Sequence, residues 1–66
     1  METLWLPISG KFVEIALTVS EDTFKVSGKD HHIVEHDSSG FRYLATSDAI
    51  KKMRKESKQV TKIMNA

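Results

Sequence analysis

The chain has 66 residues, of which 39% are hydrophobic and 29% charged, and its formal net charge is +1. This composition favours a folded domain over a disordered chain, and the absence of cysteine excludes disulfides and cysteine-zinc sites. We expect a single domain over residues 1–66, with a core so small that a homodimer or a stabilising partner would be favourable.

The sequence carries no signal for membrane insertion or secretion. Its apolar runs are only a few residues long, and Met1-Glu2-Thr3 lacks the basic start of a secretion signal. We therefore expect a complete cytoplasmic protein that does not bind membranes. Residues 1–40 carry three lysines and seven acidic residues, whereas residues 41–66 carry seven basic and two acidic residues, so positive charge is concentrated in the last third.

Two strands are predicted in the first part of the chain. Residues 4–8 are apolar but contain Pro7, which favours an edge strand or a lead-in, with Trp5 covering the core from one end. Residues 11–19 alternate strictly and are rich in β-branched side chains, which predicts a strand. Residues 20–22 form a polar turn, so we expect residues 23–27 to pair with residues 11–19 as a hairpin.

Two further strands are predicted before the helix. Residues 28–30 mark a reversal, residues 31–36 form a strand, and residues 37–40 have the composition of a tight connection. If Gly40 forms a bulge, Glu35 lies opposite Tyr43. If it does not, Glu35 lies opposite Arg42, and both registers are compatible with the sequence.

An amphipathic helix is predicted over residues 47–63. Thr46 or Ser47 would cap it, and Asp48 would lie favourably against the positive end of its dipole. At about 100° per residue, one arc of this helix is apolar. The residues on this arc are Ala49, Ile50, Met53, Ser57, Val60, Ile63 and Met64.

The predicted fold is α+β: an antiparallel β-meander of four strands, or five with the N-terminal segment, covered on one face by the C-terminal amphipathic helix. Ser57 would weaken the apolar arc as a dimer seam, so packing against the sheet is favoured. The predicted core consists of Val13, Ile15, Leu17, Phe24, Val26, Ile50, Met53, Val60 and Met64.

The basic face of the predicted helix is the strongest functional signal. Six cations fall within twelve residues, opposed only by Glu56, and would suit the phosphates of a nucleic acid. A solvated outer face is the alternative interpretation. The candidate nucleic-acid-binding residues are Lys51, Lys52, Arg54, Lys55, Lys58 and Lys62.

A protein-binding regulator is the alternative function. A small phage-like inhibitor or adaptor could dock on a host protein through a sheet edge or through its uneven charge. A protein interface depends on a few buried anchors, for which Trp5 and Phe41 are the candidates.

Catalysis, a cofactor and a metal are not expected. The serines form no GxSxG elbow, and no glycine-rich phosphate loop is present. On a strand, His32 and His36 would lie about 13 Å apart, too far to share an ion, although a weak metal site and a pH-sensitive surface are alternatives. The potential ligands are Asp30, His31, His32, Glu35, His36 and Asp37.

The junction between the last strand and the helix carries a resemblance. Residues 41–49, FRYLATSDA, follow short strands and open a Thr-capped helix, and this arrangement loosely resembles the arm-binding domains of phage-type integrases. The resemblance covers about the last third of the chain and implies DNA reading by a three-stranded sheet. The acidic first half departs from that family's basic sheet, which places sheet-based DNA reading in conflict with the charge of residues 1–40.

Overall fold

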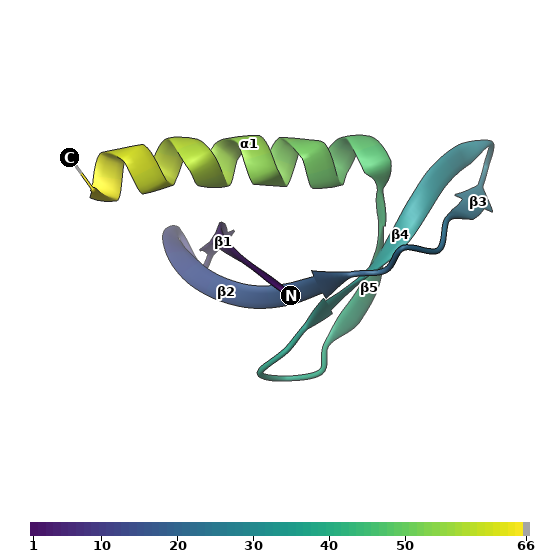
Figure 1. Cartoon of the computed structure of the whole chain (residues 1–66), viewed down its shortest axis with the longest axis horizontal. Coiled ribbons are helices and arrows are strands. Elements are labelled where there is room, and N and C mark those ends of the chain that lie inside the picture. The colour runs from purple at the N-terminus through teal and green to yellow at the C-terminus, as the bar shows by residue number, and fades with distance from the viewer. Residues whose placement is uncertain (66) are drawn as a thin grey trace.

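The computed structural model describes residues 1–65 as five strands followed by one helix (Figure 1). The antiparallel sheet with one C-terminal helix confirms the predicted α+β class. Within residues 1–65, no helix has the length and apolar composition needed to cross a membrane. The elements are β1 (Glu2–Ile8), β2 (Lys11–Val19), β3 (Phe24–Val26), β4 (Lys29–His36), β5 (Arg42–Thr46) and α1 (Ser47–Met64).

The sheet is built around β4. One edge of β4 pairs with β2 through residues 34–36 and with β3 through residues 29–31, while the other edge pairs with β5. β1 pairs antiparallel with β2 along its whole length and forms the outer edge strand. The N-terminal segment is therefore a full strand, in the edge position that Pro7 favours.

The predicted hairpin between residues 11–19 and 23–27 is wrong. Residues 20–23 do not reverse the chain but loop out between β2 and β3, which both run antiparallel to β4. Ser20 N–H donates to the Ile33 carbonyl (2.9 Å), and Ile33 N–H donates to Ser20 Oγ (3.0 Å). The reversal occurs at Ser27-Gly28, whose φ values of 52° and 77° match a two-residue hairpin turn.

The β4–β5 hairpin settles the register that the sequence left open. Glu35 lies opposite Arg42, which is the register without a bulge. The connection closes with two hydrogen bonds: His36 N–H donates to the Phe41 carbonyl (2.8 Å), and Gly40 N–H donates to the His36 carbonyl (2.7 Å). Gly40 has φ of +72°, a conformation that glycine adopts without steric cost.

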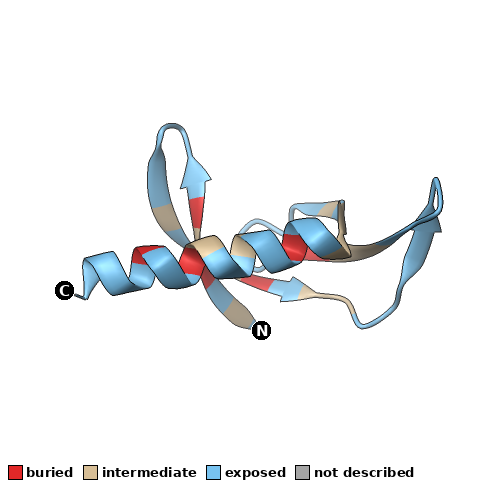
Figure 2. Cartoon of the chain, turned by 90° about the horizontal axis from the view of Figure 1, so that it is seen from above, coloured by how far each residue is buried: buried red, intermediate tan, exposed pale blue. Residues whose placement is uncertain are grey.

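Helix α1 covers one face of the sheet and also the open edge of β1. The β1–β2 hairpin crosses beneath the helix in Figure 2. Thr46 caps the helix, as predicted, because its side chain accepts a hydrogen bond from Ala49 N–H (3.0 Å). The outward N–H of Trp5 donates to Ser57 Oγ (2.9 Å), and Ser57 is 4% exposed. Ser57 thus supplies the hydrogen bond that an edge strand lacks.

The core lies where the helix meets β1, β2 and β4. Leu17, Ile50 and Val60 are buried as predicted, Ile15 and Met53 pack against the core, and Val13 is half-buried. The sequence analysis did not place three residues there, although they are equally buried. These residues are Leu4, Leu6 and Val34.

Three predicted core residues are exposed. Phe24 and Val26 lie on β3 opposite His31 and Lys29 of β4, so they share the sheet face opposite to buried Val34 and the helix. β3 also projects beyond the start of the helix (Figure 1). Met64 lies at the other end, in the last turn of α1. The sheet and the helix are thus offset, and each leaves apolar side chains outside their contact.

Candidate nucleic-acid interface

Four lysines form a continuous line along one flank of α1. Lys51, Lys55, Lys58 and Lys62 are all exposed, and we call them the lysine stripe. Their separations of four, three and four residues keep them within an arc of about 60°, at about 100° per residue. Along the axis they span about 17 Å, at about 1.5 Å per residue.

The other two predicted cations do not belong to the stripe. Arg54 forms a two-point ion pair with Glu2, through Nη2–Oε1 (2.6 Å) and Nε–Oε2 (3.1 Å). The hydrogen bond from Arg54 lowers the pKa of Glu2, and the same bond raises the pKa of Arg54. Lys52 points about 90° away from the stripe around the helix axis. The structure therefore brings four of the six predicted residues together.

The stripe carries unneutralised positive charge. In residues 1–65, the two salt bridges join Lys25 to Asp30 and Arg54 to Glu2, and neither includes a stripe lysine. An exposed cation that is not held by a carboxylate can bind a phosphate without first breaking an ion pair.

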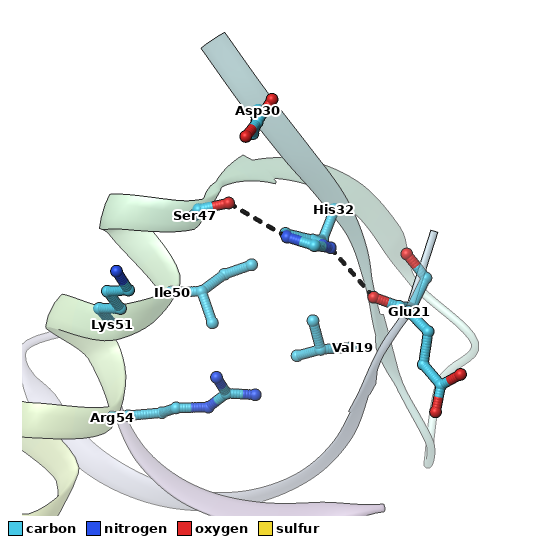
Figure 3. A pocket seen from close by; sticks show the side chains of 9 residues that line it. Val19, Glu21, Asp30, His32, Ser47, Ile50, Lys51 and Arg54 are labelled. Carbon is cyan, nitrogen blue, oxygen red and sulfur yellow. Dashed lines mark hydrogen bonds between the residues drawn. The ribbon is translucent and has the colours of Figure 1, made fainter. Parts of the chain in front are cut away.

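A cavity of about 510 Å³ opens beside the first turns of α1 (Figure 3). We call it the His32 pocket. Its walls come from the end of β2, the loop after it, β4 and the helix, and Lys51 links it to the lysine stripe. Val19 and Ile50 form the apolar part of the wall, Asp30 lies at the pocket, and the side chain of Glu21 points away from the cavity (Figure 3).

His32 is fixed in this pocket by three hydrogen-bond partners. Its Nδ1 lies 3.1 Å from the carbonyl oxygens of both Ser20 and Asp22, so Nδ1 carries the donated proton. Its Nε2 lies 3.1 Å from Ser47 Oγ and accepts from that hydroxyl when the ring is neutral. These contacts hold the helix start against the loop that separates β2 from β3.

The Ser47–His32 contact has the length expected of a nucleophile and its base. Backbone carbonyl groups, rather than a carboxylate, orient the histidine. We interpret the Ser47–His32 hydrogen bond as a structural contact that joins the start of the helix to the sheet. The expectation that the chain has no catalytic site stays a prediction.

The three histidines lie on β4, as predicted, but in separate environments. His31 contacts the Lys29 carbonyl through Nδ1 (2.9 Å), and His32 faces the helix. His36 packs edge-on against Phe41 and Tyr43, at ring-centre distances of 5.7 and 5.6 Å, and its buried Nε2 has no hydrogen-bond partner among residues 1–65. Within the same residues, no group of three histidine or acidic side chains is arranged to hold a metal ion.

The sheet face turned away from the helix carries an apolar patch. Alternate residues of β4 face opposite sides, and Ile33 lies opposite Leu44 on the side away from buried Val34. Phe24, Val26 and Leu44 are 40%, 45% and 51% exposed. We call Phe24, Val26, Ile33 and Leu44 the open-face patch; they border a shallow groove with Lys25 and Arg42 at its rim.

The two aromatic residues proposed as protein anchors differ in exposure. Trp5 is half-buried: its backbone N–H contacts the helix, whereas its side chain lies on the opposite face of β1 from buried Leu4 and Leu6. Phe41 is 59% exposed and leans on His36 and Tyr43.

Sequence analysis missed the His32 pocket because its walls come from four separate segments. One signal was available in the sequence. Ser47 is a second hydroxyl residue beside the capping residue Thr46, and Ser47 itself does not cap the helix. It missed the open-face patch because the alternation in residues 23–27 was interpreted as core.

Comparison with known proteins gives no match to a family model, to a curated protein or to a solved structure. The resemblance of residues 41–49 to integrase arm-binding domains therefore has no support beyond the junction itself.

Proposed function

We propose that this protein is a small non-enzymatic regulator that binds nucleic acid through the lysine stripe. The observation that carries the proposal is the alignment of four exposed lysines, none held by a carboxylate of residues 1–65, on one flank of a regular helix. Successive lysines are offset by about 4.5–6 Å along the axis at about 1.5 Å per residue, so each can meet a different phosphate.

The strength of this interaction follows from counterion release. Four phosphate contacts predict that log Kobs changes with log salt concentration with a slope of about −3.6 on duplex DNA. Affinity would then fall about 150-fold between 50 and 200 mM salt. Arg54 would add little to this slope, since Glu2 already neutralises it.

The test is fluorescence anisotropy with mixed-sequence DNA and RNA at several salt concentrations. The variant Lys51→Gln/Lys55→Gln/Lys58→Gln leaves one stripe lysine, and its slope should fall to about −0.9. The matched control is Lys11→Gln/Lys29→Gln/Lys52→Gln, which removes the same charge from exposed positions outside the stripe.

Two results would overturn the proposal. One is a wild-type chain that stays unbound at 50 mM salt and high micromolar concentration. The other is equal loss of binding in both triple variants, which would assign the effect to net charge rather than to the stripe.

A second candidate function is binding of a partner protein through the open-face patch. The observation that favours it is the cluster of exposed apolar side chains beside Arg42, while the other lining cation, Lys25, is already paired with Asp30. This chemistry fits an apolar segment that carries a carboxylate. Leu44→Asp should abolish such binding, while the triple stripe variant should keep it.

A further inference from the structure

We propose that the His32 pocket holds one unpaired nucleobase, so that the nucleic acid bound along the lysine stripe is single-stranded. This inference rests on the proposed function and names its ligand class. It starts from the position of the pocket: Lys51 lines the cavity and is also the first residue of the stripe. A strand whose phosphates follow the stripe therefore reaches the pocket at its end.

The charges inside the pocket favour a neutral group over a phosphate. Arg54 is neutralised by Glu2, and Asp30 is neutralised by Lys25 at 3.1 Å. The remaining charges, on Lys51 and Glu21, are of opposite sign. A phosphate would meet no excess of positive charge here, whereas the stripe just outside offers it. A nucleotide has this same division, with a neutral base joined to a charged phosphate.

The walls of the pocket match the two kinds of surface on a base. Val19 and Ile50 offer apolar contact to a flat ring face. The guanidinium of Arg54 is held by two bonds to Glu2, and such planar groups stack on bases. The volume of about 510 Å³ lies within the range of about 300–1,000 Å³ that is usual for small-molecule sites.

The polar groups also indicate which bases fit. Asp30 lines the pocket, whereas the Glu21 carboxylate points away from the cavity in Figure 3, and an ionised carboxylate only accepts hydrogen bonds. Adenine and cytosine carry an exocyclic amino group that donates, whereas thymine offers a carbonyl oxygen at that position. Oligo(dA) and oligo(dC) should therefore bind more tightly than oligo(dT).

A duplex cannot use the pocket unless a base leaves the stack, which carries a free-energy cost. Twelve-nucleotide oligo(dC) should thus bind about tenfold more tightly than a 12-base-pair duplex at the same salt, which is the size expected for one bound base. This order is the reverse of what charge density alone predicts, since a duplex carries more phosphates per unit length.

The decisive variant fills the pocket without touching the stripe. Glu21 is exposed and lines the pocket, so Glu21→Phe should reduce oligo(dC) affinity about tenfold and leave the salt slope unchanged. Asp22→Phe is the matched control, because its exposed neighbouring side chain is absent from the pocket wall. Circular dichroism melting checks that both variants are folded.

A measurement on the wild-type chain covers the case in which Glu21→Phe fails to fold. Cytidine monophosphate should shift the methyl resonances of Val19 and Ile50, and ribose 5-phosphate should not. Equal binding of duplex and oligo(dC), together with unmoved Val19 and Ile50 methyl signals, would overturn the pocket inference and leave the stripe proposal standing. If the wild-type chain binds neither oligo(dC) nor duplex, the pocket inference and the stripe proposal are both overturned.

Discussion

Ser57→Ala tests the connection between the helix and the edge strand. Ser57 is 4% exposed, and its Oγ accepts the Trp5 N–H at 2.9 Å, so alanine leaves a partly buried N–H without its protein partner. Such a group costs about 1–3 kcal/mol, and the higher helix propensity of alanine offsets about 0.5 kcal/mol. We therefore expect the free energy of unfolding to fall by about 1–2 kcal/mol.

The assay is thermal and urea unfolding followed by far-ultraviolet circular dichroism. For a domain of this size the melting temperature should fall by about 5–15 °C. Gln59→Ala is the control, because Gln59 is exposed on the same helix and its change to alanine should leave the melting temperature level or slightly higher. If Ser57→Ala is as stable as the wild type, the hydrogen bond to Trp5 does not contribute to stability and the reasoning fails.

Three further changes test the fold. Leu17→Ala removes a fully buried side chain, so the free energy of unfolding should fall by about 2–5 kcal/mol in urea titrations; a loss below about 1 kcal/mol would contradict the assigned core. Thr46→Ala removes the helix cap and should cost about 1 kcal/mol, and an unchanged urea midpoint would refute the cap. Glu2→Gln removes the ion pair with Arg54, which is partly exposed, so the cost should stay below about 1 kcal/mol. Because the pKa of Glu2 is lowered from 4.5, the wild-type advantage should be full near neutral pH and vanish as pH falls below that lowered pKa; an advantage that persists in acid would exclude the pair as its cause.

The order of the elements could be predicted because their patterns are local. The alternation in residues 11–19 and the apolar arc of residues 47–63 each fix a periodicity, and the structure has β2 and α1 at those places. The path between β2 and β4 could not be predicted in the same way. A polar cluster such as residues 20–23 is compatible with a reversal or with a looped-out segment, and only pairing with Ile33 decides between them.

Burial could be predicted only where the second layer was known. Alternation shows that Phe24 and Val26 share a face, but it does not show which face of the sheet the helix covers. Pro7 illustrates the opposite case. Trp5, two residues earlier, directs its N–H outward to Ser57, so the missing N–H of Pro7 also lies on the outer side and costs no ladder bond. Pro7 is therefore compatible with a complete edge strand whose residues Leu4 and Leu6 belong to the core.

In the candidate site, too, features within one element could be predicted, whereas features that join distant parts of the sequence could not. The lysine stripe could be predicted because four residues on one helix set their own spacing. The ion pair that takes Arg54 out of the phosphate-binding surface could not be predicted, because its partner Glu2 lies 52 residues away in the sequence. The His32 pocket also depends on segments that meet only in the folded chain.

Four lysine contacts alone set a limit on what the stripe can do. Phosphate contacts carry no sequence information, and non-specific binding at physiological salt lies at dissociation constants of about 10⁻⁴–10⁻⁶ M. A regulatory role needs a further contact, and the chain offers two places for it. The His32 pocket lies beside the stripe and would select the nucleic acid, whereas the open-face patch lies on the far side of the sheet and would recruit a protein. Since the two surfaces share no lining residue, one partner need not displace the other, and Glu21→Phe and Leu44→Asp should act independently.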